Sequence, residues 1–186
     1  MMKAARPSAA AVLAMLAMVS AQAGEMKLRL GDAVLQKSLP SGSGMNAHAG
    51  RYFVVGDNSP YLFTVDRKFR ITDRRRLNDI PVDRSGRIPK AQKPDYEAMA
   101  KVLWEGAAWH LIVGSGSRAA TRETGLLVAA DGTSAPYVRD LGMLYRDFAA
   151  KADFPGDQLL NIEGLAVAEE YAYFFNRGNG GRNVLL

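Results

Sequence analysis

A short repeated stretch constrains this chain more than any other feature of its sequence. Residues 95–100 (DYEAMA) recur as residues 161–166 (NIEGLA), each with an acid or its amide, then Glu, a small residue, a large aliphatic residue and Ala. A third copy upstream aligns Ser43 with Glu97 and Glu163. Such a repeat predicts a fold made of similar units in succession.

Apolar segments of strand length follow each copy of the repeat and are separated by turn residues. Residues 40–44, which contain Pro, Gly and Ser, are expected to break the chain before the first of them. The segments are residues 51–55, 61–65 and 69–72, then 99–104, 109–113, 125–129 and 136–138, then 164–168, 171–175 and 184–186. Four short antiparallel strands per unit are typical of a propeller blade. The sequence therefore predicts an all-β fold, a partial (open or truncated) β-propeller of four-stranded antiparallel blades.

The blades are expected over residues 40–73, 95–140 and 161–186, as one partial, one full and one truncated unit. Residues 74–94 contain charges of both signs and several prolines, which predict a long surface connection. Residues 141–151 have helical spacing and predict a short inserted helix. Because the third unit ends within its third strand, its apolar edge is expected to favour self-association.

The first 23 residues have the features of a secretory signal peptide. Lys3 and Arg6 form a positive leader, residues 9–19 are an apolar core, and residues 21–23 (AQA) fit the small-residue cleavage rule. No later run is long and apolar enough for a membrane helix. We therefore expect a periplasmic or secreted domain over residues 24–186, with a strand over residues 26–30. The lack of cysteine excludes disulfides and cysteine catalysis.

Three segments carry a resemblance to a known group of proteins: residues 93–99 (KPDYEAM), 111–117 (LIVGSGS) and 161–166 (NIEGLA). Over roughly residues 40–186 the chain resembles the N-terminal part of uncharacterised secreted β-propellers of the phytase-like and SdiA-regulated kind. In the related calcium-dependent lactonase and gluconolactonase propellers, a Glu that begins an innermost strand binds the metal. The resemblance implies this role for Glu97 and Glu163. The remaining metal ligands of those propellers come from later blades and have no counterpart in this sequence.

Four residues at the starts of the repeats are candidate metal ligands: Glu97, Glu163, Asp95 and Asn161. Their hard oxygen atoms suit calcium or magnesium. In the alternative interpretation, each Glu accepts backbone hydrogen bonds from the neighbouring blade, and Asp95 and Asn161 cap the preceding turns. The two Glu carboxylates are also a candidate acid and base if burial separates their pKa values.

A second set of polar residues occupies equivalent strand ends in the three repeats. They are candidate contacts for a small anionic or polyhydroxyl ligand, although turn chemistry alone also explains several of them. The set is Asp57, Asn58, Ser115, Ser117, Arg118, Asn176 and Arg177. Trp104 and Trp109 are expected to pack between blades. Nucleic acid is not a predicted partner, because acids flank the basic run at residues 74–76 and no aromatic residues are interleaved.

Two functions are compatible with these patterns. The first is an exported metal-dependent hydrolase, similar to phosphoesterases or lactonases, with calcium held partly by Glu97 and Glu163. In this chain the activity is expected to be weak or lost. The second is a non-catalytic propeller that binds a ligand or a protein partner in the cell envelope.

Overall fold

The structure, a computed structural model, describes residues 33–154, 159–178 and 181–186. The chain divides into two units, Met1–Val34 and Leu35–Leu186. Only residues 33 and 34 of the first unit are described, so the predicted signal peptide and the strand over residues 26–30 lie outside the described residues. Every strand among the described residues belongs to the second unit.

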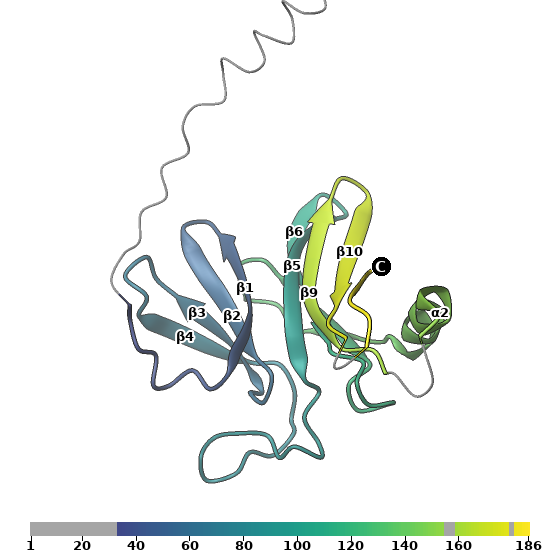
Figure 1. Cartoon of the computed structure of the whole chain (residues 1–186). Coiled ribbons are helices and arrows are strands. Elements are labelled where there is room, and N and C mark those ends of the chain that lie inside the picture. The colour runs from purple at the N-terminus through teal and green to yellow at the C-terminus, as the bar shows by residue number, and fades with distance from the viewer. Residues whose placement is uncertain (1–32, 155–158, 179–180) are drawn as a thin grey trace, which may run out of the picture. The chain divides into compact units, whose positions relative to one another are not determined.

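Three antiparallel sheets follow one another along the chain, each formed from strands that are neighbours in sequence (Figure 1). The first contains β1 (Gly42–His48), β2 (Arg51–Gly56), β3 (Tyr61–Val65) and β4 (Ile71–Arg76). The second contains β5 (Tyr96–Trp104), β6 (Ala107–Gly114), β7 (Thr124–Ala129) and β8 (Tyr137–Asp140). The third contains β9 (Ile162–Ala168), β10 (Tyr171–Asn176) and β11 (Val184–Leu185). The expectation of a mainly antiparallel β protein is confirmed.

The same irregularity occurs at the start of the first strand of every sheet. Glu97 is the extra residue between the pairs Tyr96↔Gly114 and Ala98↔Val113. Ser43 is skipped in the same way between Gly42 and Gly44, and Glu163 between Ile162 and Gly164. Each is thus the unpaired residue of a β-bulge, a feature that redirects a side chain out of the regular alternation. The predicted alignment of Ser43, Glu97 and Glu163 is confirmed.

The first sheet has four strands, so the prediction of a partial first unit is wrong. Residues 40–44 were expected to break the chain, but Gly42 and Gly44 lie within β1. A Cβ on Gly44 would lie 3.1 Å from both N and Cβ of Met99. Glycine at this position therefore allows β1 to approach β5 closely, as glycines within strands often do.

The basic run at residues 74–76 was predicted to lie in a surface connection, and this is also wrong. All three arginines belong to β4, the edge strand of the first sheet. The guanidinium groups of Arg74 and Arg76 lie 5.2 and 5.8 Å from the ring centroid of Tyr61 on β3. Cation–π contacts and solvent exposure make charged side chains suitable for an edge strand.

Strand β5 lies between β1 and β9 and contacts both, which brings the first strands of the three sheets side by side (Figure 1). A buried apolar cluster joins the first two sheets; among its members are Phe53, Val55, Leu62, Met99, Ile112 and Leu126. Fully burying side chains of this size stabilises the fold by about 1.5–3 kcal/mol each. The start of β5 is consequently held on a packed apolar base.

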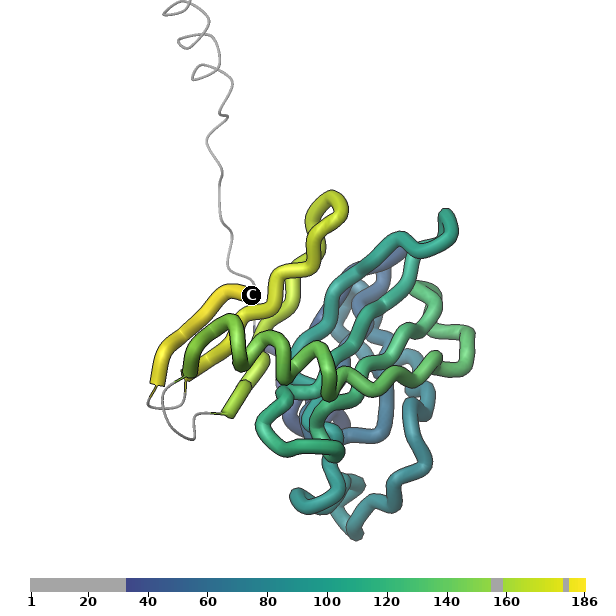
Figure 2. Tube along the Cα trace, turned by 90° about the vertical axis from the view of Figure 1, so that its right-hand side faces the viewer, coloured from purple at the N-terminus to yellow at the C-terminus, as the bar shows by residue number. Residues whose placement is uncertain are grey.

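Helix α2 (Gly142–Ala152) confirms the helix predicted between the second and third units. It lies beside the second and third sheets (Figure 2) and packs through Tyr145 and Phe148 against Phe174 and Ile162. The buried hydroxyl of Tyr145 donates a hydrogen bond of 2.7 Å to the carbonyl of Gly114, at the end of β6. No helix of the described residues is long and apolar enough to cross a membrane.

Trp104 and Trp109 do not pack between sheets as predicted. They contact each other and Tyr137 within the second sheet, with ring centroids 5.4 to 6.0 Å apart. Trp104 and Tyr137 remain 39% and 47% exposed. These aromatic residues therefore bury area mainly against one another.

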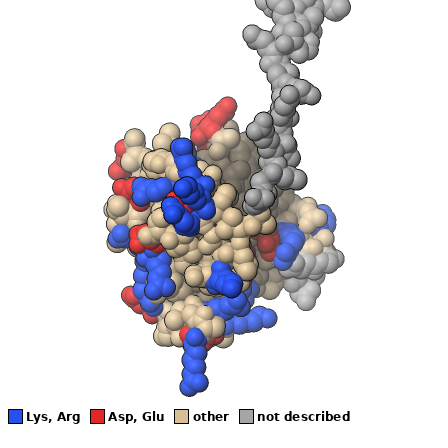
Figure 3. All heavy atoms as spheres, turned by 90° about the vertical axis from the view of Figure 1, so that its left-hand side faces the viewer, with Lys and Arg blue, Asp and Glu red and all other residues tan. Residues whose placement is uncertain are grey.

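On the side of the second unit that faces away from helix α2, lysine and arginine side chains gather on the face of the first sheet (Figure 3). Along β3, Leu62 points into the apolar cluster shared with the second sheet. Successive side chains of a strand point to opposite faces. Tyr61 and Phe63 therefore lie on the outer face of the first sheet.

Candidate functional site

The site lies where the chain enters the first strand of each sheet. One backbone hydrogen-bond pattern recurs there in all three sheets. The N–H of Ser115 donates to the carbonyl of Asp95 at 3.0 Å. The same bond joins Asp57 to Ser41 and Arg177 to Asn161. Asp57, Ser115 and Arg177, all predicted as ligand contacts, are thus equivalent positions beside the three bulges.

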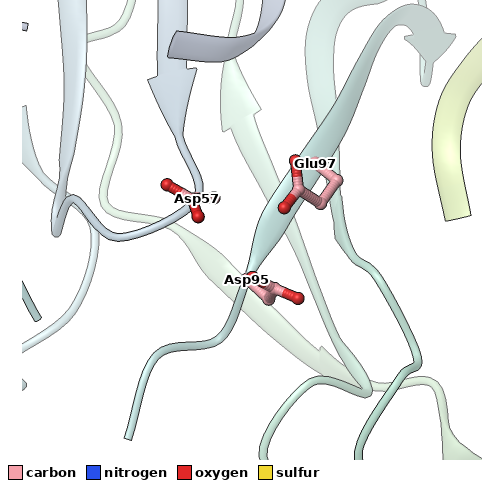
Figure 4. Close-up of side chains that lie close together, drawn as sticks. All are labelled: Asp57, Asp95 and Glu97. Carbon is pink, nitrogen blue, oxygen red and sulfur yellow. The ribbon is translucent and has the colours of Figure 1, made fainter. Parts of the chain in front are cut away.

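Three carboxylates meet at this place, with ligand atoms within 4.8 Å of one another: Asp57, Asp95 and Glu97. Figure 4 shows Asp57 at the end of a strand of the first sheet, with Asp95 and Glu97 at the start of β5. Asp95 has a φ of +58°, a left-handed conformation that Asp adopts more readily than most residues. The structure therefore combines one predicted ligand contact with two predicted metal ligands.

Lys93 lies among these carboxylates and was not predicted as a site residue. Its Nζ is 2.5 Å from Oδ2 of Asp57 and 2.5 Å from Oδ1 of Asp95. Burial alone would lower the pKa of Lys93, but hydrogen bonds to the two carboxylates outweigh it and the pKa is raised. Lys93 is consequently a fixed cation within the cluster.

Asp95 has further partners from the loop after β6. Arg122 Nη1 lies 2.7 Å from its Oδ2, and the buried Ser115 hydroxyl donates to the same oxygen at 2.6 Å. Arg122 also donates to the Ser117 hydroxyl at 2.7 Å. Burial would raise the pKa of Asp95, but the bonds from Lys93 and Ser115 and the charge of Arg122 lower it. Asp95 is therefore the ionised centre of the network at neutral pH.

Glu97 differs from its neighbours because it forms no hydrogen bond or ion pair with the described residues. It is partly buried, and burial raises its pKa to about 7, with the charges of Asp95, Glu163 and Asp57 adding to the effect. Near neutral pH its carboxyl is present in both protonation states. Glu97 is thus the carboxylate of the cluster whose oxygens are not paired with another described residue.

Glu163 and Asn161 form a separate group at the start of β9. Oε1 of Glu163 accepts a hydrogen bond of 2.7 Å from the Asn161 amide and lies 2.9 Å from Nη2 of Arg177. The backbone N–H of Asn161 donates to Oδ1 of Asn176 at 2.6 Å. The predicted four-residue metal set is therefore divided between two neighbouring places.

The alternative interpretation, in which each Glu accepts backbone hydrogen bonds from a neighbouring blade, is not supported by the contacts of the two glutamates. Neither Glu97 nor Glu163 accepts a backbone hydrogen bond within the described part of the chain. Four predicted ligand contacts also lie outside the cluster: Asn176 and Arg177 belong to the group at β9, and Asn58 and Arg118 bond elsewhere. Asn58 donates to the Ser41 hydroxyl as a turn residue, and the exposed Arg118 donates to the carbonyl of Ala91.

With this geometry known, comparison with protein families is informative. The pattern of the Family of unknown function (DUF6929) matches residues 38–186, which include all three sheets and every residue of the cluster. This chain belongs to the DUF6929 family. A search of curated proteins gave no match.

The donor atoms of this DUF6929 chain can be tested against calcium, the metal implied by the resemblance. Asp57, Asp95 and Glu97 have the oxygen ligands that calcium prefers. However, the Lys93 ammonium lies between two of these carboxylates, and Arg122 pairs with one of them. In this arrangement the cluster does not fit a calcium ion, because its central position is taken by an amine.

The sequence analysis missed two cations of the cluster, Lys93 and Arg122. Only Lys93 has a signal in the sequence. Lys93 stands only two positions before Asp95, directly ahead of the repeated motif, so it lies near the motif's acid whatever the local backbone conformation. This spacing is a usable signal for Lys93. Arg122 lies in an irregular loop of the DUF6929 chain, 27 positions after Asp95 in sequence, and only the folded loop brings it there.

Proposed function

We propose that this DUF6929 chain is an exported β-propeller protein that binds a small neutral polyhydroxyl ligand, such as a sugar or cyclitol, beside Glu97. The propeller assignment is supported by three successive antiparallel meanders whose first strands lie side by side. The shared bulge at the start of each first strand supports it further. Propellers place such strands nearest their axis and commonly bind ligands there.

The charges around Glu97 favour a neutral ligand. Lys93 and Arg122 already balance Asp57 and Asp95, so the cluster offers no open cation to an anion. With a pKa near 7, the Glu97 carboxyl is able both to accept and to donate a hydrogen bond. Hydroxyl groups satisfy both roles.

The single observation that carries the proposal is the partly buried Glu97 carboxyl, which has no partner among the described residues. Calorimetric titration of the wild type with glucose and with myo-inositol tests it. Replacing Glu97 by Ala should weaken binding about tenfold or more, because a hydrogen bond to a charged group is worth about 1.5–3 kcal/mol. The exposed Glu170, changed to Ala, is a matched control. Equal affinity in wild type and E97A, or no binding of either probe, would refute the proposal.

A second candidate is the metal-dependent phosphoesterase-like or lactonase-like hydrolase, favoured by three carboxylates within 4.8 Å. Calcium binding at this place requires Lys93 to move away or to be absent. Calcium titration followed by thermal melting should then raise the melting temperature of the Lys93→Met variant more than that of the wild type. If neither protein responds to calcium, the metal-dependent function is excluded at this cluster.

Export rests on the leader at residues 1–23. Expression with the leader intact should yield a periplasmic or secreted product that starts near Gly24. N-terminal sequencing of the recovered protein is the measurement. A product starting at Met1 in the cytoplasmic fraction contradicts export.

A further inference from the structure

We propose that the outer face of the first sheet holds a second binding site, which takes an anionic sugar such as a hexuronate or a sugar phosphate. A cavity of about 760 Å³ lies on this face, within the usual size range of small-molecule sites. It is distinct from the carboxylate cluster: Asp57, Asp95 and Glu97 are absent from its lining.

The floor of this outer cavity comes from β3 and β4. Tyr61 and Phe63 project from β3 to the outer face, and Arg74 lies beside them on β4, paired with Phe63 across the ladder. The Arg74 guanidinium is held 5.2 Å from the Tyr61 ring centroid. A guanidinium positioned in this way loses less freedom when it binds a ligand.

Two segments outside the sheets form the walls. One comprises residues 36–41, and the other is the loop that includes Ser85, Gly86 and Arg87. Asp83 shapes this loop: its Oδ1 accepts bonds from the N–H groups of Ser85 and Arg87 at 2.8 and 3.1 Å. The loop is also anchored through the buried Ile88, whose N–H donates to the carbonyl of Asn58 at 2.8 Å. The wall is therefore ordered before a ligand arrives.

The charge of the lining is entirely positive. Lys37, Arg74 and Arg87 line the cavity, and no Asp or Glu does. None of these three side chains forms a salt bridge within the residues that the structure describes. The carboxylate of Asp83, close to Arg87 in sequence, is occupied by its own loop. Cations without a salt bridge in a concave site attract an anion and form strong charge-assisted hydrogen bonds with carboxylate or phosphate.

The remaining polar lining indicates hydroxyl groups on the ligand. Ser38 and Ser41 contribute hydroxyls. The Ser85 hydroxyl and the Gln36 amide also line the cavity, and they donate to Asp83 and to the carbonyl of Phe69. The cavity is much larger than an inorganic anion requires, and neutral donors and acceptors surround the cations. A sugar that carries a carboxylate or a phosphate matches both features.

Calorimetric titration of the full chain with glucuronate, glucose 6-phosphate and glucose tests the site. At least one anionic probe should bind at millimolar concentration or below, and glucose should bind at this site more weakly. Added salt should lower the affinity for the anionic probe. Comparison of the two anions distinguishes a carboxylate from a phosphate ligand. Arg74→Gln and Arg87→Gln should each reduce the affinity about tenfold.

Arg84→Gln is the matched control, because Arg84 belongs to the same loop but does not line the cavity. Thermal melting verifies that each variant is folded. Glu97→Ala should leave binding of the anionic probe unchanged, which separates this site from the one beside Glu97. Failure of both anions to bind at millimolar concentration overturns the proposal, as does unchanged affinity in both folded Arg→Gln variants.

Discussion

The Lys93 ammonium lies 2.5 Å from Oδ1 of Asp95, and the two side chains are only 14% and 5% exposed. Lys93 also bridges to Asp57, which belongs to the first sheet, so one lysine joins two sheets through their carboxylates. Each of these buried charges stabilises the other, because leaving a buried charge without a partner costs free energy of folding.

Replacing Lys93 by Met should lower the free energy of unfolding by about 3–5 kcal/mol, the usual cost of removing one partner of a buried ion pair. Urea denaturation at neutral pH measures the loss. Lys101→Met, at an exposed position of β5, should change stability by less than about 0.5 kcal/mol. Similar losses in both variants would mean that the Lys93 bridge contributes nothing specific.

The pKa of Glu97 makes stability depend on pH near neutrality. Its pKa is raised from 4.5 to about 7 in the folded chain, so the folded state binds this proton more tightly than the unfolded state. The contribution of Glu97 to stability therefore falls as pH rises from about 4.5 to 7. Glu97→Gln should be more stable than the wild type at pH 8, on the order of 1–2 kcal/mol after allowance for solvent screening. The difference should nearly vanish at pH 4; a constant difference at all pH values would contradict the assignment.

Ser115→Ala should destabilise the chain by about 1–2 kcal/mol at pH 7, because a buried, ionised Asp95 loses a hydrogen bond. The pKa of Asp95 is lowered on folding, so its stabilising contribution is present above the unfolded value of 3.8 and is lost as pH falls through the lower folded value. The difference in the free energy of unfolding between Ser115→Ala and the wild type should accordingly become smaller at acid pH. Urea titrations at pH 7 and pH 3 provide the comparison.

Gly114→Ala should reduce stability by about 1–3 kcal/mol through overpacking. A Cβ at Gly114 would lie 2.5 and 2.6 Å from the carbonyl oxygens of Arg122 and Pro94, which are backbone atoms and cannot rotate away. Gly106→Ala is the control, because nothing lies within 4 Å of its Cβ position. Its φ of +76° costs about 1 kcal/mol for alanine. Thermal melting of the two variants should rank Gly114→Ala as the less stable.

Local sequence pattern was sufficient to predict the parts of the fold that local geometry decides. The equivalence of Ser43, Glu97 and Glu163 was visible because each bulge depends on a short motif and on the strand that follows it. Strand β1 was missed because its glycines resemble a break. The close approach of Gly44 to Met99 is a contact between residues more than 50 positions apart.

The same distinction between local pattern and long-range contact applies to the residues of the site. Asp95 and Glu97 were found from the repeat, and Asp57 from its place at a strand end. That all three belong to one cluster was not predictable, because Asp57 comes from another sheet and Lys93 joins it across 36 positions of sequence. Charge pairing of this kind depends on how sheets pack, which a repeat motif does not encode.

The bulges have a consequence for how proteins of this kind diversify. A residue skipped by the ladder has no cross-strand partner in register, so changing it leaves the pairing on both sides intact. At this equivalent position Ser43 already carries a hydroxyl, and Glu97 and Glu163 carry carboxyl groups. Each sheet can thus carry a hydroxyl, an acid or an amide at this position without a change in strand register.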